Sequence, residues 1–92
     1  MGVMRMADQW FVYIIEYHKN KLYTGITTDV ERRFAEHSSG SGKAARALRG
    51  KGPYALVYVE KAANRSEASV RECEIKKMTR QQKLALVEAA VL

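Results

Sequence analysis

The chain has 92 residues, the length of one domain, and its hydrophobic fraction of 47% excludes wholesale disorder. Its only cysteine excludes an intrachain disulfide, and no apolar run approaches the roughly 18–20 residues that span a bilayer. The net charge of +6 is unevenly placed, because residues 43–83 carry eleven Lys or Arg against four acids, which indicates a polyanionic partner or a solubilising surface.

The start of the chain has no apolar core of the kind that a signal peptide needs. We therefore expect residues 1–9 to form a frayed leader before a single domain over residues 10–92. The lone Cys73 fits a reducing, cytoplasmic setting, and we expect its side chain to be buried as a small hydrophobic group.

Three short segments have the residue types that favour strands. Residues 10–15 form an unbroken apolar and aromatic run, and residues 22–27 follow it after a polar stretch at 17–20. This pattern predicts a hairpin. A third strand is predicted over residues 54–60, after the proline at position 53.

Helix starts are indicated by a capping residue with Glu or Gln three positions later. The pattern occurs at Thr28 and Glu31, Asn64 and Glu67, and Thr79 and Gln82. We expect the first helix to begin near residue 29 and to end near the glycines at 40 and 42, with a short helical turn at 43–48. The second helix should run to about residue 78. The order strand, strand, helix, strand, helix, helix predicts an α+β fold with a three-stranded, mainly antiparallel sheet flanked by helices.

An ordered set of motifs over residues 10–86 resembles the GIY-YIG nuclease superfamily. The tripeptides FVY at 11–13 and YTG at 23–25 match its two motifs, and the helix that follows carries Arg33 and His37. Residues 21–29 and 75–80 are similar to the small stand-alone bacterial members. The resemblance implies metal-dependent hydrolysis of a DNA phosphodiester.

The resemblance implies that Tyr13 and Tyr23 are catalytic, by activating or orienting the attacking water. An odd-numbered hairpin loop places Tyr13 opposite Gly25 and diagonal to Tyr23, whereas an even-numbered loop places the tyrosines on opposite faces. The alternative is two ordinary tyrosines at the edge of the core. Which of the two would activate water stays open. Gly25 is expected to let the backbone or a phosphate approach closely.

Arg33 and His37 are four residues apart and therefore share a helix face. A guanidinium keeps its charge and grips two phosphate oxygens, so the resemblance assigns Arg33 to stabilising the transition state. The alternative is a surface ion pair with Asp29. His37 is expected to assist with the water, and its alternative role is to complement the helix dipole. Arg32 should face solvent or the DNA backbone.

The superfamily holds one divalent metal ion with a glutamate on the helix that follows the third strand. Glu67, Glu72 and Glu74 are the candidates. Glu72 lies on one helical stripe with Ala68 and Ile75, at the border of the core, and is our choice. Glu67 is accounted for by capping, and Glu74 falls on another side. A single carboxylate with waters and substrate phosphate suits Mg²⁺ or Mn²⁺.

The segment 40–52 is basic, and its glycines predict a mobile loop. It carries Lys43, Arg46, Arg49 and Lys51 and no acid. We expect these side chains to bind phosphates without reading sequence. The alternative for each is a solvated surface charge.

The sequence therefore predicts a bacterial, metal-dependent endonuclease that acts on DNA, with DNA favoured over RNA. We expect it to be structure-directed and linked to DNA repair or recombination, with an unseen protein partner as a possible source of specificity and no membrane partner. One alternative is a nucleic-acid-binding module on the same scaffold with little or no turnover. Another is a protein-interaction domain whose basic face meets an acidic partner.

Overall fold

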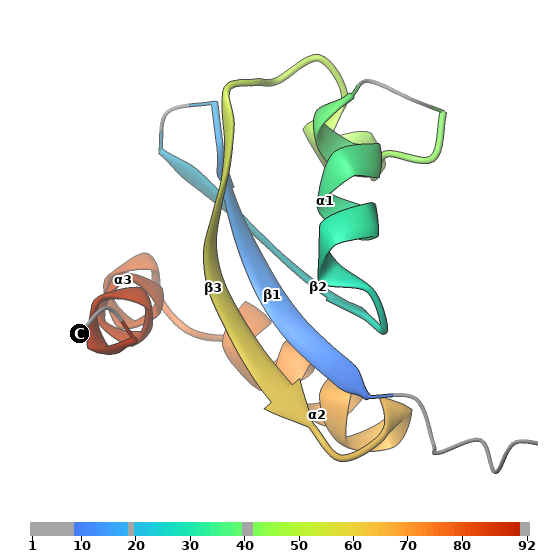
Figure 1. The fold of residues 1–92 in the computed structure, drawn as a ribbon. Coiled ribbons are helices and arrows are strands. Elements are labelled where there is room, and N and C mark those ends of the chain that lie inside the picture. Colours follow the sequence, from blue (N-terminus) through green and yellow to red (C-terminus); the bar gives the residue numbers. More distant parts are fainter. Residues whose placement is uncertain (1–8, 19, 40–41, 91–92) are drawn as a thin grey trace, which may run out of the picture.

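The computed structural model describes residues 9–18, 20–39 and 42–90, so most of the expected leader lies outside the described residues. The elements are β1 (Trp10–Tyr17), β2 (Lys21–Thr27), α1 (Val30–Ser38), the 3₁₀ turn η1 (Arg46–Leu48), β3 (Tyr54–Ala62), α2 (Arg65–Lys76) and α3 (Arg80–Ala89). Figure 1 shows the sheet between α1 on one side and α2 on the other. The predicted α+β fold and its element order are confirmed.

The sheet has three antiparallel strands in the order β2-β1-β3. Tyr17 pairs with Lys21, so the hairpin loop spans three residues, 18–20. This odd-numbered loop brings Tyr13 opposite Gly25 and Ile15 opposite Tyr23, so both tyrosines lie on the same face. The pairing of β1 with β3 is shifted between Ile14 and Ile15.

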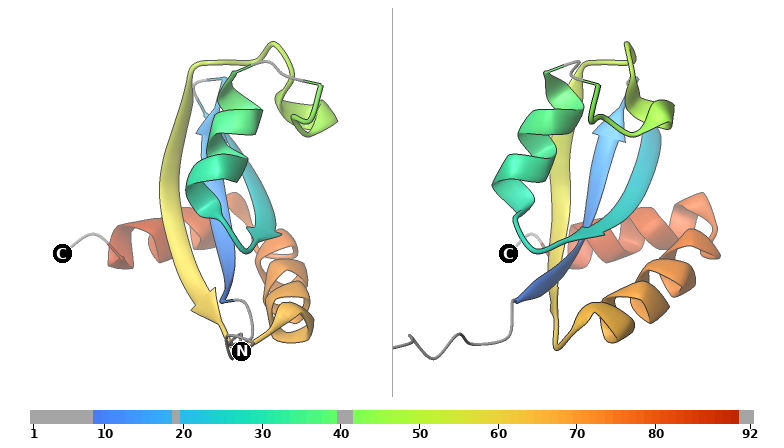
Figure 2. Two further views of the ribbon diagram at one scale, coloured as in Figure 1. Left: turned by 45° about the vertical axis from the view of Figure 1, so that its right-hand side comes forward. Right: turned by 90° about the vertical axis from the view of Figure 1, so that its right-hand side faces the viewer.

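Alternation along β1 divides the interior into two clusters, one on each face of the sheet. Figure 2 shows the helices on these two faces, α1 on one and α2 on the other. Val12 and Ile14 are fully buried against Ala68 and Ile75 of α2, and α3 adds half-buried apolar side chains to this cluster. On the other face, Tyr13 and Ile15 pack with Leu48 of η1 and with Phe34 of α1. The face toward α2 is apolar, whereas the face toward α1 carries polar side chains.

Local capping explains where the helices begin. The prediction that Thr28 caps the first helix is wrong, because the Asp29 carboxylate accepts the Arg32 N–H at 3.0 Å. Thr27 Oγ1 holds the Asp29 N–H at 3.1 Å and so prepares this cap. The other two predicted caps are confirmed, since Asn64 caps α2 and Thr79 forms a capping box with Gln82 in α3.

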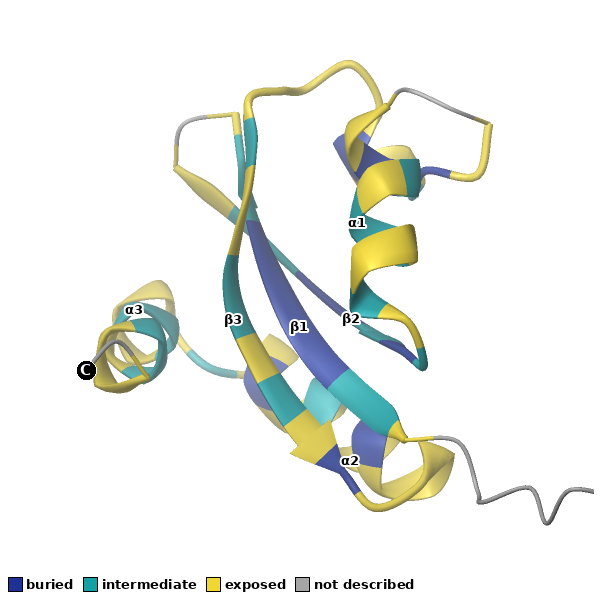
Figure 3. Ribbon diagram, viewed as in Figure 1, coloured by how far each residue is buried: buried dark blue, intermediate teal, exposed yellow. Residues whose placement is uncertain are grey.

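Figure 3 shows both buried and exposed stretches along α2. The expectation that Cys73 is buried is wrong, because this residue is exposed. Buried Ala68 and Ile75 define the inner stripe of α2, and Cys73 lies two residues from Ile75, about 200° around the helix. None of the described helices is long and apolar enough to span a membrane.

Candidate active site

The centre of the site is a buried contact between β1 and α1. Tyr13 Oη and His37 Nε2 lie 2.9 Å apart, and the two side chains are 2% and 0% exposed. Tyr23 completes a cluster of three rings, with its centroid 6.4 Å from that of Tyr13 and 5.5 Å from that of His37. The structure therefore brings both tyrosines of the sequence motifs against the histidine.

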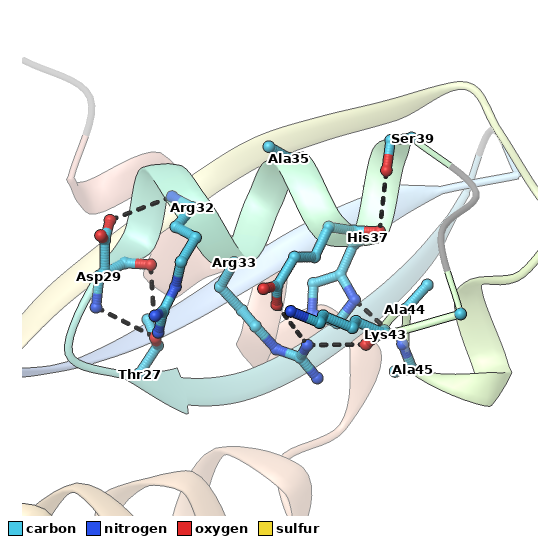
Figure 4. Close-up of polar contacts among 12 residues, drawn as sticks. Thr27, Asp29, Arg32, Arg33, Ala35, His37, Ser39, Lys43, Ala44 and Ala45 are labelled. Atoms are coloured by element: carbon cyan, nitrogen blue, oxygen red, sulfur yellow. Dashed lines mark hydrogen bonds and ion pairs between the residues drawn. The ribbon is translucent and has the colours of Figure 1, made fainter.

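The state of His37 is fixed by its second hydrogen bond. The backbone N–H of Ala45 donates to Nδ1 at 3.1 Å (Figure 4). Because that donor requires a lone pair on Nδ1, the neutral ring carries its proton on Nε2 and donates it to Tyr13 Oη. Burial, and then the nearby charge of Arg33, lower the pKa of His37 from 6.5 to about 4. The imidazole is thus a neutral donor at physiological pH.

Tyr13 is held in its protonated form. Burial, followed by the neighbouring Tyr23, raises the pKa of Tyr13 to about 12, and the negative charge of Glu72 adds to the rise. Arg33 acts in the opposite direction and lowers this pKa. Because the Tyr13 oxygen already accepts the His37 proton, its own hydroxyl proton points to another acceptor.

Gly25 is required by the ring of Tyr13. A Cβ atom at this position would lie 2.6 Å from Cζ of Tyr13, a separation that real side chains do not show. Tyr13 is almost fully buried and has no room to retreat. The close approach that we expected of a phosphate or backbone is therefore made by the Tyr13 ring itself.

Arg33 extends from α1 toward the basic loop (Figure 4). Its Nη1 donates to Glu36 Oε1 at 2.8 Å and to the carbonyl of Lys43 at 2.8 Å. The expected alternative partner, Asp29, caps the helix instead. The guanidinium also lowers the pKa of Glu36. Arg33 is half-buried and lies near Tyr13, so its charge is directed into the site, whereas Arg32 is exposed.

Glu72 of α2 lies close enough to Tyr13 for its negative charge to raise the pKa of that tyrosine. Its side chain is 23% exposed and pairs with Lys76 Nζ at 3.2 Å. Glu67 and Glu74 instead line a cleft of about 360 Å³ between β3 and α2. Glu74 also pairs there with Arg71.

The four basic side chains of the loop are all exposed, as expected, although residues 40–41 lie outside the described part. The rest of the loop is more firmly held than its glycines predict. Leu48 is fully buried, and its carbonyl accepts the Tyr54 hydroxyl, which in turn accepts the Lys51 N–H at 3.1 Å. Arg49 bends back to bond the loop's own main chain.

Comparison with known proteins identifies the family. A family model described as the GIY-YIG catalytic domain matches residues 9–85. The chain belongs to the GIY-YIG family. Among its relatives, the UPF0213 protein of Cronobacter sakazakii is 54% identical over 80 residues, which cover 87% of this chain and 82% of that protein. The UPF0213 protein YhbQ of Escherichia coli K12 is 53% identical over 78 residues, with coverages of 85% and 76%.

Two solution NMR structures are similar to this GIY-YIG domain. A UPF0213 protein from Bacillus halodurans is 40% identical, with a TM-score of 0.57 and coverages of 89% of this chain and 85% of that one. A protein from E. faecalis is 34% identical, with a TM-score of 0.62 and coverages of 94% and 90%. The names of these relatives state no activity. The resemblance predicted from the sequence is confirmed.

The carboxylates of the GIY-YIG domain bear on whether it can hold a divalent metal ion. No group of three or more His, Cys, Asp or Glu side chains able to hold a metal occurs within residues 9–18, 20–39 and 42–90. Glu72 offers one partly enclosed carboxylate. This donor set fits a hard cation such as Mg²⁺, which keeps several waters and shares the substrate's phosphate oxygens.

Sequence reasoning missed three contributors to this GIY-YIG site, one side chain and two main-chain groups. Glu36 had a readable signal, because it lies three residues after Arg33 with the opposite charge. The Lys43 carbonyl and the Ala45 N–H had none, since main-chain groups occur at every position and only the folded loop brings them to α1.

Proposed function

We propose that this protein is a metal-dependent endonuclease that hydrolyses phosphodiester bonds in DNA. The observation that carries the proposal is the chain of hydrogen bonds from Ala45 through His37 to the buried Tyr13, with Arg33 beside it. Placing a hydrogen-bonded tyrosine and histidine beside a charged guanidinium in a small core costs desolvation free energy, and such arrangements cluster at functional sites. A scaffold used for binding alone has little need of this set.

Arg33 is the group proposed to stabilise negative charge on the phosphate in the transition state. Its Nη1 is engaged by Glu36 and by the Lys43 carbonyl, so a phosphate gains access to the guanidinium by replacing the Glu36 carboxylate. The planar fork then stabilises the charge that builds on the phosphate oxygens in the transition state. Such preorganised donors typically contribute about 10²–10³ in rate.

The two tyrosines take different parts. Tyr13, with its pKa of about 12, is not a free base at neutral pH, and its hydroxyl proton orients the attacking water or a phosphate oxygen. His37 and Arg33 both stabilise negative charge on the Tyr13 oxygen, so the hydroxyl could pass its proton to the leaving oxygen and remain as a phenolate that these two groups stabilise. Tyr23 is only half-buried and lies beside Tyr13, where its hydroxyl would contact the attacking water.

Glu72 would hold the Mg²⁺ or Mn²⁺ ion. When bound, the metal polarises the scissile phosphate and stabilises the leaving oxygen. The Glu72 carboxylate suits this role because it is partly enclosed on α2 and lies close enough to Tyr13 for its charge to affect the pKa of that residue.

The exposed cations of the loop support DNA as the substrate. Phosphate contacts of this kind position a strand but carry no sequence information. We therefore assign the protein a preference for the shape of the DNA, such as a flap or branch, and a place in cytoplasmic DNA repair or recombination. A protein partner supplies any further specificity.

The test is cleavage of end-labelled single-stranded, duplex, flapped and branched DNA, with Mg²⁺, with Mn²⁺ and with chelator. We expect metal-dependent cutting that Glu72→Gln and Arg33→Ala each reduce by about 10²-fold or more. Glu74→Gln is the matched control, because Glu74 lies on the same helix but faces β3, and it should cut like the natural protein.

Three outcomes would contradict the proposal. Cutting that survives both changes would show that the activity belongs to another site or to a contaminant. Salt-dependent DNA binding without any cutting would instead identify a nucleic-acid-binding module. Preference for acidic polypeptides over DNA in a competition gel shift would identify a protein-interaction domain.

A further inference from the structure

Arg49 was expected to contact DNA, but its guanidinium turns back onto its own loop. Nε donates to the carbonyl of Ala44 at 3.2 Å, and Nη2 donates to the carbonyl of Gly42 at 2.9 Å. The planar guanidinium directs two of its donors at two carbonyls of one chain segment. A lysine ammonium cannot reproduce this geometry. Arg49 therefore fixes the path of residues 42–44.

The same segment supplies the main-chain groups that hold the site residues of α1. The Lys43 carbonyl accepts from Arg33 Nη1 at 2.8 Å, and the Ala45 N–H donates to His37 Nδ1 at 3.1 Å. Ala44, which lies between them in the chain, is 3% exposed. Figure 4 shows Lys43, Ala44 and Ala45 beside Arg33 and His37.

The decisive relation is that one peptide unit is held at both ends. The carbonyl of Ala44 and the N–H of Ala45 belong to the same planar group and point in opposite directions. Arg49 Nε holds the oxygen, and His37 Nδ1 accepts from the nitrogen. Rotation of this plane breaks both bonds, and a cation on the oxygen makes the N–H a stronger donor.

We propose that Arg49 is a positioning residue, which acts through the Ala44–Ala45 peptide to hold His37 in its Nε2–H tautomer against Tyr13 and through Lys43 to hold Arg33. The catalytic part of this inference rests on the proposed nuclease function. The positional part does not, because the tautomer of His37 is a property of the free protein.

Arg46 provides the matched comparison. It lies in the same loop, has the same charge and is exposed, but its side chain has no hydrogen-bond partner among the described residues. If charge alone mattered, Arg46 and Arg49 would be equivalent. If positioning matters, only Arg49 affects the state of His37.

The experiment compares Arg49→Lys, Arg49→Ala and Arg46→Ala with the natural protein, each checked for folding by circular dichroism and thermal melting. The first readout is the ¹⁵N spectrum of His37 in the free protein near pH 7. We expect the natural protein and Arg46→Ala to show the Nε2–H tautomer alone. Both Arg49 variants should show exchange between the two tautomers.

The second readout is cleavage and DNA affinity. We expect Arg49→Lys to lower kcat by about ten- to a hundred-fold, as misplacement of catalytic groups does, while Kd stays within about twofold. Arg46→Ala should raise Kd and reduce the salt slope of binding by about one. If Arg49→Ala does not fold, Arg49→Lys decides the question.

The proposal is overturned if both readouts of the Arg49 variants match those of Arg46→Ala, with an unaltered His37 spectrum and weakened DNA binding only. Arg49 is then a phosphate contact. If the natural protein cuts no DNA but the His37 tautomer still depends on Arg49, the nuclease function fails and the positioning role stands.

Discussion

The stability of the fold should depend on pH through His37, because its pKa falls from 6.5 in the unfolded chain to about 4 in the folded protein. The folded state favours the neutral imidazole, so the unfolded state binds more protons below about pH 6.5 and the free energy of unfolding falls as pH falls. With these two pKa values, the free energy of unfolding should fall by about 2 kcal/mol between about pH 7.5 and about pH 5. The loss reaches its full size only near pH 4, where carboxylates also begin to titrate.

The measurement is urea or thermal unfolding at several pH values between about 7.5 and about 5. For a domain of this size, 2 kcal/mol corresponds to a decrease in Tm of about 8–16 °C. His37→Gln should remove this slope, since an amide can accept from Ala45 and donate to Tyr13 without titrating. His18→Gln, at the exposed hairpin turn, should keep it because His37 is retained. Equal slopes in the natural protein and His37→Gln would refute the reasoning.

Further substitutions test the packing around the site, the cap of α3 and the bond that Tyr54 makes to the basic loop. Gly25→Ala should lower stability by about 1–3 kcal/mol in urea unfolding and shift the ¹⁵N signals of His37, because the new Cβ displaces Tyr13; unchanged signals would contradict the close contact. Thr79→Ala should cost about 1 kcal/mol by removing the cap of α3, while Thr28→Ala, which caps nothing, should not. Tyr54→Phe should cost about 1 kcal/mol and speed hydrogen exchange at the Lys51 amide, whose acceptor is lost.

The order of elements could be predicted because strand alternation and helix capping are local patterns. The sheet face of the tyrosines stayed open in the sequence, because odd-numbered and even-numbered hairpin loops give opposite answers. The three-residue loop decides it and brings Tyr13 opposite Gly25. The cap of α1 could not be chosen from spacing, since Thr28 and Asp29 are both good caps. Thr27 decides between them by holding the Asp29 N–H, a contact that the motif does not reveal.

Side chains that could carry chemistry were open to proposal from the sequence, whereas main-chain groups were not. The resemblance selected Arg33 by its spacing from Tyr23, and it selected Glu72 together with the helical stripe of Ala68 and Ile75. Arg49 has the same signature as Arg46, and only the folded loop shows that it bonds the Ala44 carbonyl. The exposure of Cys73 was predictable from the helical stripe defined by Ile75, and the error came from the general tendency of cysteine to be buried.

In the protein without substrate or metal, each ionisable group of the site is either held neutral or paired with an opposite charge. This bears on how the proposed reaction would begin. His37 is neutral, Tyr13 is protonated, Arg33 is paired with Glu36, and Glu72 is paired with Lys76. No group among them is a ready base at neutral pH. On the proposed mechanism, a dication held by Glu72 would take the place of the Lys76 ammonium, and a substrate phosphate at Arg33 would take the place of the Glu36 carboxylate. Metal and substrate would then complete the charge of the site together, and either ligand alone would leave it unable to activate water.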